Sequence, residues 1–208
     1  MSFRRVALVA LPLLFVRCDF GIDTKGLAGD AAPPDDVSQG DDAADEATPD
    51  VVAPTVLLGD SDVEGIQGSS VQNAPDGYRF VASSSGNATA VWIYVDAATD
   101  SAATLDVGIY DDDSSTTPSQ PKSLLAQASF GSVTPDSWNS QTIPSTAITS
   151  GSTYWIVVLS KSGTFYYRNA GGTSGSLESV SSSATSLPST WAVPTTKNDG
   201  PASMYLTP

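Results

Sequence analysis

The chain has 208 residues, with 23 acidic and 9 basic side chains, a formal net charge of −14 and a single cysteine. It contains no histidine, which excludes His-based catalytic triads, imidazole general bases and histidine zinc sites. No basic stripe is present that could neutralise phosphates, so we expect no nucleic-acid partner.

The first segment of the chain is typical of an export signal. Arg4 and Arg5 precede an unbroken apolar run, residues 6–16, which is too short to span a bilayer as a helix. Cys18 follows this run directly after Arg17. We therefore expect residues 1–18 to form a lipoprotein-type signal peptide that exports the protein.

Leu14-Phe15-Val16-Arg17-Cys18 resembles the lipobox of bacterial lipoproteins. The resemblance implies that Cys18 carries a diacylglyceryl group, that the leader is cut before it, and that the lipid holds the protein on the cell membrane or outer membrane. Arg17 stands where the pattern has a small residue. Two alternatives therefore remain open: a plain secretory leader cut after Ala28 or Ala32, which would yield a secreted protein, and an uncleaved anchor.

Residues 19–62 predict a linker. Thirteen acidic residues and one base, Lys25, lie between Asp19 and Glu64, among many Ala, Pro and Gly residues. With almost no large apolar residue before Val51, this stretch cannot bury enough surface to offset the entropy of ordering, and its like charges repel one another. We expect a disordered acidic tether.

Residues 63–208 predict one β-domain. Apolar and polar residues alternate over short runs that are separated by Gly, Ser, Pro, Asn and Asp. In the run 90–96, for example, Trp92 and Tyr94 share one face and the valines share the other. The expected strands are 78–82, 90–96, 105–110, 123–130, 138–143, 153–160, 164–168, 176–180 and 203–207.

No long segment has a helical period, although residues 124–128 could equally begin as a helical turn. About nine or ten short strands with turn signals between them are typical of two packed antiparallel sheets. The fold class we expect is therefore all-β, an antiparallel β-sandwich of jelly-roll type behind the acidic tether.

The order of four motifs resembles that of jelly-roll accessory domains in secreted bacterial proteins. The motifs are residues 107–113, 121–126, 138–143 and 148–158, the last with Tyr154-Trp155 after a turn at Gly151. The resemblance covers about residues 78–207. It implies an architecture and no binding residues, because such domains occur beside glycoside-processing enzymes, on extracellular proteins and alone behind anchors.

The four tryptophans fall into two pairs. Trp92 and Trp155 lie in expected strands, and we expect both in the core. Trp138 and Trp191 stand beside loop-type residues, where an exposed indole can stack on the apolar face of a sugar ring. Both are candidate ligand-binding residues; the alternative is that they plug the open ends of the sandwich.

Tyr166 and Arg168 are two further ligand-binding candidates. They alternate with other residues of the aromatic cluster 165–169, so they share one face of the expected strand. On that face they could line a shallow platform.

Asp111, Asp112 and Asp113 follow a strand at the entry to a loop and are candidate calcium ligands. A calcium ion would suit an exported sandwich that has no disulfide. The alternative is a solvated acidic turn, because three consecutive acidic side chains cannot all point at one ion. We expect no other cofactor.

These features predict a non-catalytic lipoprotein, tethered to a membrane outside the cytoplasm and monomeric. We expect its sandwich to bind an extracellular or cell-envelope ligand, with a glycan as the first candidate. The alternative is a structural or protein-binding surface module without a small ligand, which could pair through a sheet edge.

Overall fold

The computed structural model describes residues 55–173, 176–179, 183–191, 194–197 and 200–208. The leader with Cys18 and residues 19–54 of the expected linker lie outside these described residues. Within them the regular secondary structure is β, and every strand pairing is antiparallel. The described part of the chain has no helix long and apolar enough to cross a membrane. The predicted all-β antiparallel sandwich is confirmed.

All nine strands expected from the sequence are present, including the segment 124–128, which is part of a strand rather than a helical turn. Four strands were not expected: β1, β2, β11 and β12. The elements are β1 (Leu58–Gly59), β2 (Ile66–Ser70), β3 (Pro75–Val81), β4 (Gly86–Val95), β5 (Thr104–Asp113), β6 (Gln120–Phe130), β7 (Ser137–Ile148), β8 (Thr153–Ser162), β9 (Phe165–Thr173), β10 (Ser176–Ser179), β11 (Pro194–Lys197), β12 (Gly200–Ala202) and β13 (Met204–Thr207).

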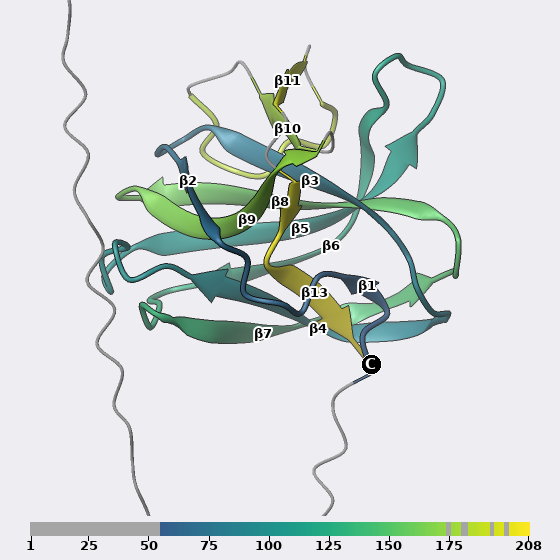
Figure 1. The fold of residues 1–208 in the computed structure, drawn as a ribbon. Helices are drawn as coiled ribbons and strands as arrows, with labels where there is room; N and C mark the ends of the chain where they lie inside the picture. The colour runs from purple at the N-terminus through teal and green to yellow at the C-terminus, as the bar shows by residue number, and fades with distance from the viewer. Residues whose placement is uncertain (1–54, 174–175, 180–182, 192–193, 198–199) are drawn as a thin grey trace, which may run out of the picture. The chain divides into compact units, whose positions relative to one another are not determined.

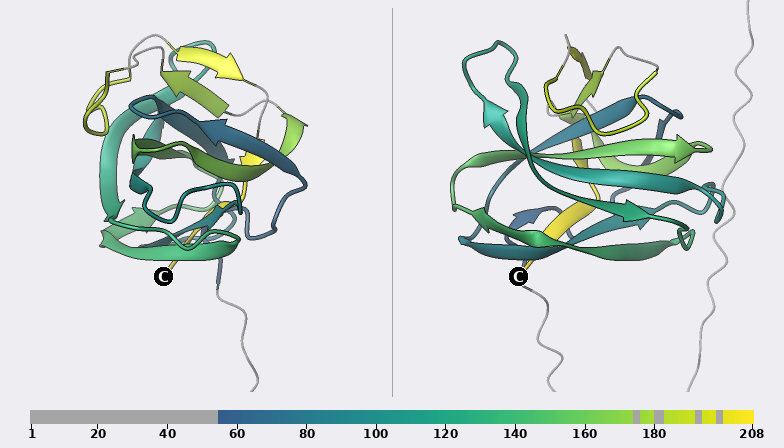
Figure 2. Two further views of the ribbon diagram at one scale, coloured as in Figure 1. Left: turned by 90° about the vertical axis from the view of Figure 1, so that its left-hand side faces the viewer. Right: turned by 180° about the vertical axis from the view of Figure 1, so that it is seen from behind.

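Two main sheets pack face to face (Figure 1). One has the order β1-β13-β4-β7 and the other the order β11-β10-β3-β8-β5-β6. Consecutive strands β3, β4 and β5 pass from one sheet to the other and back, which is the interleaving that a jelly roll shows. The views in Figure 2 show the same two layers, together with the smaller sheet β12-β9-β2.

The core lies between the two main sheets. Alternate residues of each central strand point into it and are fully buried, as the period-two pattern predicts. Each such side chain removes apolar surface from water, at about 25 cal/mol per Å². The central contributors are Val91, Ile93 and Val95 of β4, Leu105, Val107 and Ile109 of β5, Ile156 and Val158 of β8, and Met204 and Leu206 of β13.

β1 lies before the domain boundary expected at residue 63 and pairs with β13. Leu58 is fully buried in the core, and its register partner on β13 is Leu206. Gly59 has a φ of 104°, and a Cβ at this position would lie 2.1 Å from the carbonyl oxygen of Met204. Only glycine permits this close approach. Leu58 and Gly59, within the residues assigned to the linker, therefore pack as part of the sandwich.

A second apolar cluster lies on the outer face of the six-stranded sheet. Residues 183–191, here called the strap, place Leu187 and Trp191 over side chains of β5 and β8. Gly108 leaves the space that Leu187 occupies, because a Cβ at position 108 would lie 2.8 Å from Leu187 Cδ1. The residues beneath the strap are Tyr110, Trp155, Val157 and Leu159. Side chains on both faces of β8 are thus buried.

Candidate functional site

The outer face of the four-stranded sheet carries four aromatic side chains, here called the aromatic strip: Trp92, Tyr94, Trp138 and Tyr205. They come from three adjacent strands, β4, β7 and β13. The strand register sets Trp92 opposite Tyr205 and Tyr94 opposite Trp138. Because their neighbours along β4 and β13 point into the core, these rings project away from it.

The rings of the strip contact one another in an unbroken series. Trp92 and Tyr205 are stacked, with centroids 5.7 Å apart and planes 4° apart. Trp138 meets Tyr205 edge to face at 4.9 Å and Tyr94 at 5.5 Å. Tyr205, between two indoles, is only 7% exposed, whereas Trp92, Tyr94 and Trp138 are half-buried. The open ring surface of the strip therefore belongs to these last three residues.

Polar groups fix both ends of the strip. The Tyr94 hydroxyl donates a hydrogen bond of 2.7 Å to Asp136 Oδ1, and the Trp92 indole N–H donates one of 3.3 Å to Thr207. The hydrogen bond to Asp136 is the main cause that raises the pKa of Tyr94 above its ordinary value, with partial burial next. Asp136 itself has a φ of 54°, a left-handed conformation that aspartate tolerates better than most residues.

The loop that leads into Trp138 is held by Asn139. Its side-chain oxygen accepts a hydrogen bond of 2.8 Å from the Thr134 amide, and its Nδ2 donates to the carbonyl oxygens of Thr134 and Ser137 at 2.9 and 3.0 Å. These bonds fix the backbone on both sides of Asp136. A ligand that stacks on Trp138 would meet a ring that is already in place, which lowers the entropy lost on binding.

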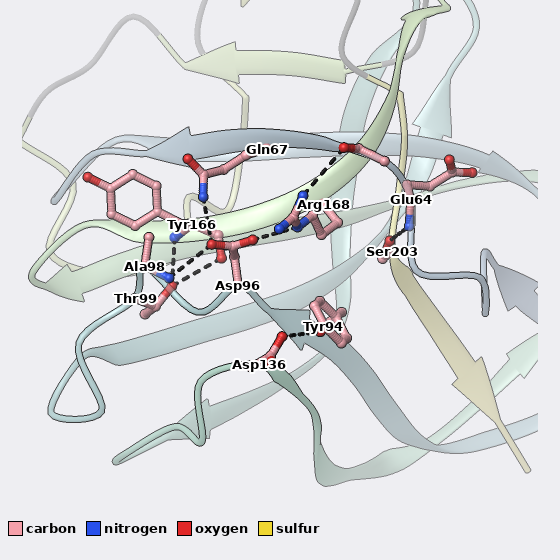
Figure 3. A network of polar contacts seen from close by, with 11 residues as sticks. Glu64, Gln67, Tyr94, Asp96, Ala98, Thr99, Asp136, Tyr166, Arg168 and Ser203 are labelled. Atoms are coloured by element: carbon pink, nitrogen blue, oxygen red, sulfur yellow. Dashed lines mark hydrogen bonds and ion pairs between the residues drawn. The ribbon is translucent and has the colours of Figure 1, made fainter. Parts of the chain in front are cut away.

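A polar network lies beside the Tyr94 end of the strip (Figure 3). Asp96 accepts hydrogen bonds from the Ala98 amide at 2.9 Å and from Gln67 Nε2 at 2.6 Å, and it forms an ion pair of 2.5 Å with Arg168 Nε. Burial by itself would raise the pKa of Asp96, but these hydrogen bonds and the Arg168 charge outweigh it, so the pKa lies below its ordinary value.

Tyr166 and Arg168 share the outer face of β9, as predicted, but their polar groups serve the fold. The Tyr166 backbone exchanges hydrogen bonds with Thr99 Oγ1 at 2.9 and 3.1 Å. Arg168 pairs with Asp96 and also donates to the Gly65 carbonyl oxygen at 3.4 Å. Both residues therefore fix the turn after β4, and Arg168 is engaged rather than free to bind an anion.

The two tryptophan pairs are divided differently from the prediction. Trp155 is in the core region, at 1% exposure, but Trp92 lies on the open strip and not in the core. Trp191 is only 8% exposed and meets Tyr110 edge to face at 6.2 Å. Its ring offers no open face to a sugar, so we leave Trp191 out of the candidate site. Trp138 is the predicted binding tryptophan that does lie on an open surface.

The three aspartates proposed for calcium do not converge. Asp111 accepts a hydrogen bond from the Ser123 amide, Asp112 from the Trp155 indole N–H at 2.7 Å, and Asp113 from the amide and hydroxyl of Ser115. Among the residues that the structure describes, no three acidic, histidine or cysteine side chains are grouped so as to hold a metal ion. Each carboxylate instead fixes a different part of the β5–β6 hairpin and its neighbour β8.

Three members of the strip were missed as site residues from the sequence: Trp92, Tyr94 and Tyr205. Their alternation with buried residues was visible, and it does place them on the faces opposite to the core. The missing information was the register that brings β13 beside β4 and so joins the rings into one surface.

Relatives add nothing to this geometry. Comparisons with protein-family models, with curated proteins and with solved structures found no match to this chain. What the site can bind therefore follows from its own side chains: open aromatic rings, fixed polar groups at both ends and a rigid sheet beneath.

Proposed function

We propose that the sandwich binds a glycan through the aromatic strip, outside the cytoplasm and without catalysis. The observation that carries this proposal is the series of ring contacts from Trp92 through Tyr205 and Trp138 to Tyr94 on an open sheet face. Aromatic rings attract the C–H groups on the apolar faces of sugar rings, and nearby hydroxyl and carboxylate groups pair with sugar hydroxyls.

Polar side chains suited to sugar hydroxyls lie beside the rings. Ser140 is the exposed register partner of Trp92 on β7, and Thr142 follows it on the same face. Asp136 is exposed and uses one carboxylate oxygen to accept from Tyr94. Apolar rings with hydroxyl and carboxylate groups on one fixed surface form the combination that carbohydrate recognition needs.

The anchor belongs to the same proposal and rests on the sequence alone. A lipid on Cys18 and the acidic residues 19–62 would hold the sandwich at a membrane surface while leaving its strip free to meet a polymer. Labelled fatty acid should be incorporated into the wild-type protein and not into Cys18→Ser. Incorporation that survives this substitution would rule out Cys18 as the anchor.

Binding is tested with the full-length chain, solubilised in detergent, on insoluble cellulose, chitin, xylan and mannan. We expect saturable retention on at least one polymer, and we expect Trp138→Ala and Trp92→Ala each to weaken it at least tenfold. Tyr166→Ala is the matched control, because it removes a half-buried ring from β9 that lies outside the strip.

The outcome decides between the two classes of module expected from the sequence. Retention that both tryptophan variants lose, and that Tyr166→Ala keeps, supports the glycan proposal. No retention by a chain whose near-ultraviolet circular dichroism shows a folded sandwich would overturn it and leave a protein-binding surface as the alternative.

A further inference from the structure

The charges around the Tyr94 end of the strip are mainly negative (Figure 3). Asp136 holds the Tyr94 hydroxyl, and Glu64 lies next to Ser203, whose backbone carbonyl accepts from the Tyr94 amide. Asp60 and Asp62 lie close enough to Glu64 that, after its own partial burial, their proximity raises its pKa. Asp136 is therefore the carboxylate in contact with this end of the aromatic surface, and the backbone of Glu64 is joined to the same end through Ser203.

Arg168 is the base that lies among these acids, and it is already engaged. Its Nε pairs with Asp96, whose side chain is 2% exposed, and its Nη1 donates to the Gly65 carbonyl oxygen. The guanidinium group is therefore occupied by Asp96 and by the Gly65 carbonyl oxygen. The Tyr94 hydroxyl is bound to Asp136 Oδ1, so the second carboxylate oxygen of this exposed residue, Oδ2, lies outside that hydrogen bond.

We propose that the strip selects glycans that carry protonated amino groups, such as polymers of glucosamine, over neutral N-acetylated and acidic ones. This inference rests on the proposed glycan binding and names the ligand class for the same surface. An ammonium group donates charge-assisted hydrogen bonds to a carboxylate such as Asp136, and it is attracted to the faces of Trp and Tyr rings. A uronic acid would meet the same carboxylates with like charge.

The size of the preference follows from the exposure of Asp136. A single exposed ion pair contributes little, but a polymer presents several amino groups to one surface, so we expect about a fivefold to tenfold advantage in Kd. Because the interaction is screened by ions, the advantage should shrink at high salt, whereas ring stacking should change little.

The test measures Kd for the full-length chain in detergent with hexamers of glucosamine, N-acetylglucosamine and galacturonic acid, at mildly acidic pH and at two salt concentrations. We expect the glucosamine hexamer to bind most tightly and Asp136→Asn to remove its advantage over the N-acetylglucosamine hexamer. Asp106→Asn is the matched control, because Asp106 lies on β5 in the six-stranded sheet.

The results separate the two proposals. Equal or tighter binding of the neutral or acidic hexamer, or a glucosamine advantage that Asp136→Asn retains, would overturn the charge selection and leave glycan binding intact. Failure of a folded chain to bind any of the three hexamers or the insoluble polymers would overturn glycan binding, and the selection with it.

Discussion

The two outer faces of the sandwich carry similar side chains and differ in what lies over them. On the six-stranded sheet, Trp155 and Tyr110 are buried because the strap covers them with Leu187 and Trp191. On the four-stranded sheet, Trp92, Tyr94 and Trp138 remain half-buried, and no segment of the described chain forms a comparable cover. Aromatic residues at outward positions of a strand can therefore serve as core or as surface.

We therefore expect the two faces to differ in whether their aromatic side chains contribute to stability or to binding. A ring beneath the strap gains its contacts within the chain, so its loss should lower the free energy of unfolding. A ring on the strip keeps surface free for a ligand, so its loss should lower binding more than stability. The comparison can be tested by parallel substitutions on the two faces.

The largest effect is expected for Trp155→Ala. The substitution removes a side chain that is 1% exposed, and Asp112 loses the hydrogen bond that it accepts from the indole N–H. We expect the free energy of unfolding to fall by about 3–5 kcal/mol, against about 1 kcal/mol for Trp92→Ala. Urea unfolding followed by circular dichroism measures both, and equal losses would show that the strip is as integral to the core as the covered face.

Asp96→Asn should have the next largest effect. Replacing the carboxylate removes the ion pair with Arg168 and weakens the bonds from Ala98 and Gln67, and we expect a loss of about 2–3 kcal/mol at neutral pH. Its folded pKa lies below the unfolded value, so wild type gains stability above about pH 4 and loses it as the pH falls through the folded pKa.

The pH dependence provides the control for Asp96. Stability curves of wild type and Asp96→Asn should converge as the pH falls through the lowered folded pKa of Asp96, because the wild-type carboxyl is then protonated. A difference that stays constant down to strongly acidic pH would show that the loss comes from packing rather than from the charge.

Gly108→Ala should disturb the covered face by a smaller amount. The new Cβ would lie 2.8 Å from Leu187 Cδ1 and 2.9 Å from Leu124 Cδ1, so these side chains must move. We expect a loss of about 1–3 kcal/mol and brighter, more quenchable Trp191 fluorescence. Gly131→Ala is the matched control, since nothing lies within 4 Å of its Cβ position. Similar losses of unfolding free energy in the two variants would contradict the conclusion that Gly108 makes room for Leu187.

The smallest effects are expected for two hydroxyl deletions. Tyr110→Phe removes a bond of 2.8 Å to the Pro188 carbonyl oxygen beneath the strap, and Tyr94→Phe removes the bond to exposed Asp136. We expect about 1 kcal/mol for Tyr110→Phe and less than about 0.5 kcal/mol for Tyr94→Phe, because the Asp136 carboxylate is rehydrated. Thermal unfolding compares the two variants. A larger loss of stability for Tyr94→Phe would contradict the expectation that the covered face contributes more to stability than the open face.

Much of the fold was visible in the sequence because alternation is a local property. The run 90–96 shows which residues of β4 share a face, and nine strands were located in this way. β1 and β2 were missed because Leu58-Gly59 is too short to alternate and residues 66–70 are mostly small and polar. Their strand conformation depends on partners far along the chain.

The candidate site was only partly visible for the same reason. Trp138 was identified from its loop-like neighbours, and it lies on the open strip. Trp191 has similar neighbours but is buried, because the strap folds back over β5 and β8. No local pattern distinguishes these two tryptophans.

By itself, the sequence determined the fold class and the two faces of each long strand, since both follow from the chemistry of adjacent residues. Only the tertiary structure decided which outward face is covered and which rings join into one surface. Those properties arise where β13 lies beside β4 and where the strap lies over the six-stranded sheet. Contacts between segments so distant in the chain depend on packing of the whole domain, which alternation within a single strand does not encode.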